Sequence, residues 1–100
     1  MGTKALSQEI AENITELKKL KAKSPSRKLS NRLQNLYDAL HQAQGKEWME
    51  QVEQYKEAKI ALDKAKQAAQ DAINDLAKTA DAIEKAAKAF KAVLAALAVL

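Results

Sequence analysis

The chain has 100 residues, of which 17 are basic and 13 acidic, giving a formal net charge of +4. This length suits one modest domain, and because 21 residues are alanine, which buries little surface, we expect a thin core. The absence of cysteine excludes disulfides, thiolate metal sites and cysteine nucleophiles, whereas two glycines, one proline and runs of Ala, Lys, Glu, Gln and Leu predict an all-α protein.

The first two predicted helices carry clear apolar faces. Apolar residues three or four apart predict a helix over about residues 4–22, with the face Leu6, Ile10, Ile14, Leu17 and Leu20. Ser24 and Pro25 then fit the N-cap and the first position of a second helix over about residues 25–44. The second face consists of Leu29, Leu33, Leu36, Tyr37 and Leu40. The short connection predicts that the two helices are antiparallel neighbours.

Basic residues gather around this connection. Residues 18–32 contain no acidic residue and seven basic ones: Lys18, Lys19, Lys21, Lys23, Arg27, Lys28 and Arg32. The helix dipole accounts for lysines in the last turn of the first helix, but it disfavours Arg27 and Lys28 in the first turn of the second. We therefore treat the seven residues as a candidate anion-binding patch, for nucleic-acid phosphates or anionic lipid headgroups.

A heptad pattern dominates the rest of the chain. Gly45 is expected to end the second helix. From Trp48 to Leu97 apolar or alanine positions alternate in steps of four and three, interrupted by charge only at Lys59 and Lys66. This pattern predicts a third helix over residues 46–98, about 80 Å long.

Three architectures fit these elements. We favour an elongated antiparallel bundle of three helices in a single domain over residues 1–100. In one alternative the chain remains helical through Gly45. In the other it folds back near Thr79–Asp81, where Thr79 or Asp81 would cap the fourth helix of a four-helix bundle.

The C-terminal part is amphipathic at first and then wholly apolar. Asp81 with Lys85, and Glu84 with Lys88, stand four apart in the favourable order. No polar side chain follows Lys91, so this end is expected to be buried in the bundle, in a second copy or in a bilayer interface. The candidate partner or membrane contacts are Phe90, Val93, Leu94, Leu97 and Leu100. Because the pattern stops at Leu100 without a cap, we expect the chain to be part of a longer protein.

The sequence contains no catalytic constellation. The single histidine, His41, has no evident partner and is expected at the surface, and no cofactor, metal or small-molecule substrate is expected. We expect non-enzymatic association with itself or another helical protein, through the long third helix and the apolar C-terminal end. One alternative is a membrane-active module, pore- or toxin-related, and another is nucleic-acid binding through residues 18–32. Neither a signal peptide nor a complete transmembrane span is visible, which favours a cytoplasmic location by default.

Overall fold

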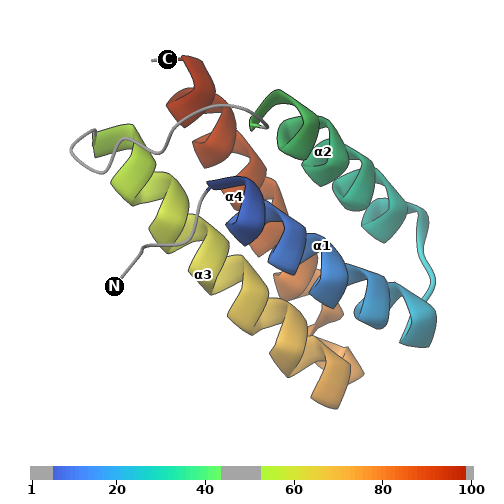
Figure 1. The fold of residues 1–100 in the computed structure, drawn as a ribbon. Coiled ribbons are helices and arrows are strands. Elements are labelled where there is room, and N and C mark those ends of the chain that lie inside the picture. The colour runs from blue at the N-terminus through green and yellow to red at the C-terminus, as the bar shows by residue number, and fades with distance from the viewer. Residues whose placement is uncertain (1–5, 44–52, 99–100) are drawn as a thin grey trace.

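The computed structural model describes residues 6–43 and 53–98, which form two helical hairpins (Figure 1). The first hairpin consists of α1 (Leu6–Lys23) and α2 (Arg27–Ala43). The second consists of α3 (Glu53–Asn74) and α4 (Thr79–Ala98), joined through the short 3₁₀ helix η1 (Leu76–Lys78). The predicted all-α bundle is confirmed. The predicted turn at Gly45, together with Trp48 and Leu100, lies outside the described residues.

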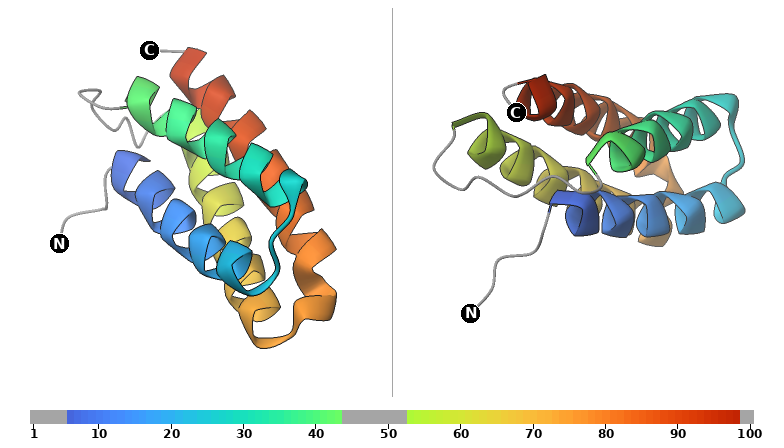
Figure 2. Two further views of the ribbon diagram at one scale, coloured as in Figure 1. Left: turned by 90° about the vertical axis from the view of Figure 1, so that its right-hand side faces the viewer. Right: turned by 45° about the horizontal axis from the view of Figure 1, so that its top comes forward.

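The two hairpins pack against each other along their length. α1 packs on α3 and α2 packs on α4, so α2 and α3 lie diagonally across the bundle (Figure 2). Within the bundle, α1 and α3 run in the same direction, as do α2 and α4 (Figure 1). The radius of gyration is 12.9 Å and the principal extents are 37 × 24 × 19 Å. This radius agrees with the value of about 13 Å expected for a compact domain of 100 residues.

The prediction of one continuous helix over residues 46–98 is wrong, because the chain reverses after Asn74. Asp75 has extended backbone angles (φ −146°, ψ 97°), and its Oδ1 accepts a hydrogen bond from the amide of Ala77 at 3.2 Å. The hydroxyl of Thr79 donates to the carbonyl of Leu76 at 2.7 Å. The structure is therefore the four-helix alternative. Asp75 caps η1 rather than α4, and Thr79, predicted as a possible cap, is the C-cap of η1 and the first residue of α4.

The reversal changes which heptad positions are buried. Ala82, Ala86, Ala89, Val93 and Ala96 form the buried stripe of α4, each one residue before a predicted position. In α3, Ala58 and Ala65 are buried in place of the predicted Lys59 and Lys66. Alanine at the centre of a contact permits close packing of helices, and larger or charged side chains then lie at its edges.

The start of α2 also differs from the prediction, by two residues. Ser26, not Ser24, is the cap, because its hydroxyl accepts a hydrogen bond from the amide of Leu29 at 3.0 Å. The amide of Ser24 instead bonds the carbonyl of Leu20 at 2.8 Å and extends the end of α1. Pro25 disfavours helical angles at Ser24, which agrees with the end of α1 at Lys23.

Large and small side chains are unevenly divided in the core. The first hairpin supplies mainly leucine and isoleucine, including Leu17, Leu20 and Leu36, which are almost fully buried. The second hairpin supplies mainly alanine, with Tyr55, Leu62 and Val93 as its largest fully buried side chains. The first hairpin therefore contributes most of the apolar area removed from water.

Candidate functional site

A polar seam joins α1 to α3 inside the bundle. The side-chain amide of Asn13, which is 1% exposed, donates to the carbonyls of Glu9 and Leu62 at 3.1 Å each. One turn further along α3, Lys66 Nζ lies 2.7 Å from Glu12 Oε1. The hydrogen bond to Glu12 raises the pKa of Lys66, partial burial opposes this, and the charges of Glu9 and Glu16 reinforce it. These contacts fix the register of the two helices and leave no free amide on Asn13 for chemistry.

The seven residues of the predicted anion-binding patch have different environments. Lys19 lies 3.5 Å from Glu16 on its own helix. Lys23 Nζ donates to the carbonyl of Ile73 at 3.3 Å, near the C-terminal end of α3. Both cations therefore already have acceptors within the protein. The bond from Lys23 stabilises the end of α3, which is a structural role.

The other five residues of the patch surround the turn between α1 and α2. Lys18 Nζ lies 5.3 Å from the centre of the Tyr37 ring, which is a cation–π contact. Lys18, Lys21 and Tyr37 line a groove of about 550 Å³ between the two helices. Arg27 and Lys28 are exposed at the start of α2. Arg32 is half-buried, and its Nε–H has no hydrogen-bond acceptor within the described part of the chain.

The predicted contacts at the apolar C-terminal end are divided by burial. Val93 is fully buried, so it could contact a partner or a membrane only if the bundle opened. Phe90 and Leu97 are half-buried against the core, whereas Leu94 is 37% exposed. Leu94, Leu97, Ala98 and Gln42 line a groove of about 420 Å³ between the ends of α2 and α4. Leu100 lies outside the described residues.

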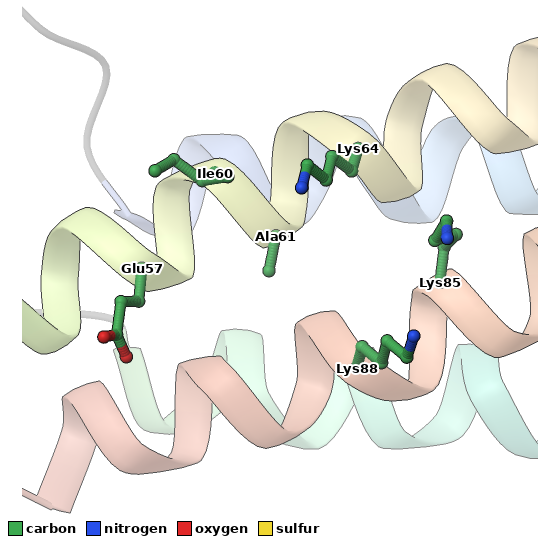
Figure 3. Close-up of a pocket in the computed structure, with 6 residues that line it drawn as sticks. All are labelled: Glu57, Ile60, Ala61, Lys64, Lys85 and Lys88. Atoms are coloured by element: carbon green, nitrogen blue, oxygen red, sulfur yellow. The ribbon is translucent and has the colours of Figure 1, made fainter.

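A third groove lies between α3 and α4, and the sequence analysis did not identify it (Figure 3). It has a volume of about 270 Å³ and is lined by Glu57, Ile60, Ala61, Lys64, Lys85 and Lys88. Ile60 is 55% exposed and lies outside the predicted heptad stripe, which is the sequence feature that could have revealed the groove.

Two of the three lysines in this groove already have partners. Lys85 lies 3.7 Å from Asp81, and Lys88 lies 3.4 Å from Glu84. The predicted ion pairs on this helix are therefore confirmed. Because each pair satisfies its lysine with a carboxylate of the same helix, the groove has less unbalanced positive charge than its three lysines suggest.

The remaining features bear on metal and membrane binding. His41 is exposed on α2. Among residues 6–43 and 53–98, no three histidine or carboxylate side chains are grouped so as to hold a metal ion. None of the helices in these ranges combines the length and apolarity needed to cross a bilayer.

Comparison of the chain with protein-family models, curated proteins and solved structures finds no match in any of the three.

Proposed function

We propose that this protein is a non-enzymatic assembly module that pairs with a second copy of itself through the apolar end of α4. The observation that carries the proposal is an exposed leucine beside an apolar groove. Leu94 is 37% exposed, and it borders the groove that also contains Leu97 and Ala98. Burying these side chains against an apolar surface would remove them from water.

The arrangement suits a symmetric pair. In a two-fold interface the same patch of both copies meets, so the patch must be complementary to itself. An apolar patch can meet this requirement, and Leu94, Leu97 and Ala98 supply one where they line the groove between the ends of α2 and α4. One such leucine per copy buries little area, which favours a weak, concentration-dependent dimer.

Membrane insertion of the same end would require a larger change. Val93 and Ala96 are fully buried between helices, so α4 could offer its whole apolar face to lipid only if the bundle opened. Pairing through Leu94 needs no such opening.

The test is sedimentation velocity over a range of concentrations. Leu94→Gln should shift the dimer to monomer, weakening association about tenfold, because it places a polar amide at the contact. Ile60→Gln is the matched control, since Ile60 is more exposed but lies in the groove between α3 and α4. A wild-type protein that stays monomeric at millimolar concentration, or equal effects of the two variants, would contradict the proposal. Flotation of the same sample with anionic vesicles reports the membrane alternative.

A further inference from the structure

The groove between α1 and α2 differs chemically from the other two. Its apolar lining consists of Leu33, which is only 6% exposed, and of the exposed residues Ala22 and Pro25. Its rim carries Lys18 and Lys21. A cavity of about 550 Å³ that combines an apolar lining with a few placed polar groups is typical of a ligand-binding recess.

No carboxylate of the described residues balances the positive charge at this rim. No aspartate or glutamate lines the groove, and no described carboxylate lies within ion-pair distance of Lys18 or Lys21. Arg27 and Lys28, exposed in the first turn of α2, add positive charge beside the same turn. The first turn of α2 contains no acidic residue. An anionic partner would therefore meet cations that no described carboxylate pairs.

The lysine over the tyrosine ring favours one class of anionic partner. Lys18 covers a face of Tyr37, so that face is not open for stacking a nucleic-acid base. A bilayer presents a broad surface, whereas this site is a recess with an apolar lining. A protein segment can place an apolar side chain on Leu33 and carboxylates beside Lys18 and Lys21.

We propose that the groove between α1 and α2 binds an acidic segment of another protein, which inserts an apolar side chain between Lys18 and Lys21. This surface is separate from the one around Leu94, so the inference stands independently of the proposed self-association. It gives Lys18 and Lys21 one shared role.

The test is fluorescence anisotropy with a labelled peptide that has glutamates on both sides of a central phenylalanine. Lys18→Gln combined with Lys21→Gln should weaken binding at least about tenfold, because both charge-assisted contacts are lost. Lys56→Gln combined with Lys91→Gln is the matched control, since it makes the same change in net charge at exposed positions of α3 and α4. The control should bind within about twofold of the wild type. Circular dichroism should show both double variants folded.

Two further probes separate the alternatives. A peptide with alanine in place of the phenylalanine should bind about tenfold more weakly, because the apolar contact is lost. Tighter binding of a single-stranded oligonucleotide of equal charge, or of anionic phosphatidylserine vesicles, would overturn the proposal in favour of a phosphate surface. Equal affinity for both peptides, equal effects of the two double variants, or no binding of the first peptide at low salt would also overturn it.

Discussion

At the scale of single residues, the fold changes the proton affinity of two side chains in α3. Burial raises the pKa of the Tyr55 phenol above its ordinary value of 10.0. The hydrogen bond to Glu12 raises the pKa of Lys66 above its ordinary value of 10.5. Both groups therefore keep their protons to a higher pH in the folded state than in the unfolded state. Their stabilising contribution is complete below the unfolded-state pKa and is lost as the pH rises through the folded-state pKa.

We predict that the free energy of unfolding decreases as the pH is raised from about 9 to 11, and that Tyr55→Phe makes this decrease smaller. Phenylalanine lacks the hydroxyl group, so burial at this position no longer opposes an ionisation. Urea denaturation at several pH values measures the effect as a slope, so any constant loss of stability in the variant cancels. Tyr37→Phe is the control, because Tyr37 is at the surface. An equal change of slope in both variants would disprove the role of burial.

At the scale of secondary-structure elements, the contact between α3 and α4 is made largely by alanine. Ala65, Ala69 and Ala72 of α3 and Ala82, Ala86 and Ala89 of α4 are all buried. A well-packed contact of small side chains leaves no room for extra methylene groups, although leucine and alanine are both good helix formers. The contact is therefore sensitive to volume rather than to helix propensity.

Ala86→Leu should destabilise the protein by about 1–3 kcal/mol because it overpacks this contact. Ala80→Leu, which adds the same atoms at an exposed position of α4, should change the free energy of unfolding by less than about 0.5 kcal/mol. Urea denaturation of the two variants measures the difference. If the two substitutions had the same effect, the packing of α4 described here would be incorrect.

The buried face of a helix could be predicted from the sequence only where large apolar residues mark it. Leu and Ile mark a single stripe in α1, so the sequence identified the apolar residues of its buried face. In α2, Leu29, Leu33 and Leu36 are buried as predicted, but Tyr37 is 38% exposed, Leu40 is half-buried, and Ala39 and Ala43 complete the buried face. In α3 and α4 alanine occurs on several faces, and neighbours such as Ala58 and Lys59 fit the same heptad count, so the buried phase was ambiguous. The reversal of the chain was predicted only as an alternative, near Thr79–Asp81, because the heptad pattern continues across Asp75. The groove at Tyr37 depends on the juxtaposition of α1 and α2, which spacing within one helix does not reveal.

At the scale of the whole molecule, the buried residues form one continuous core across both hairpins. Leu36 in α2 is fully buried, as are Leu62 in α3 and Val93 in α4. Neither hairpin can bury its apolar face without the other. We therefore expect the described helices to unfold together.

Leu36→Ala should lower the free energy of unfolding by about 2–5 kcal/mol because it removes buried methyl groups and leaves a cavity. Native-state hydrogen exchange should show the same loss for the slowest amides of α3 and α4 as for those of α1 and α2. Gln34→Ala, an exposed change in the same helix, is the control. Faster exchange confined to α1 and α2 would mean that the hairpins unfold separately.

The polar seam between α1 and α3 also affects how quickly the chain can fold. The contacts of Asn13 with Leu62, Lys23 with Ile73 and Glu12 with Lys66 join positions 49, 50 and 54 residues apart. Each contact requires closure of a long loop, whose entropic cost precedes any gain from the bond. The turns within each hairpin close much shorter loops. We therefore expect each hairpin to form before the two meet, and the meeting of the hairpins to be the slower step of folding.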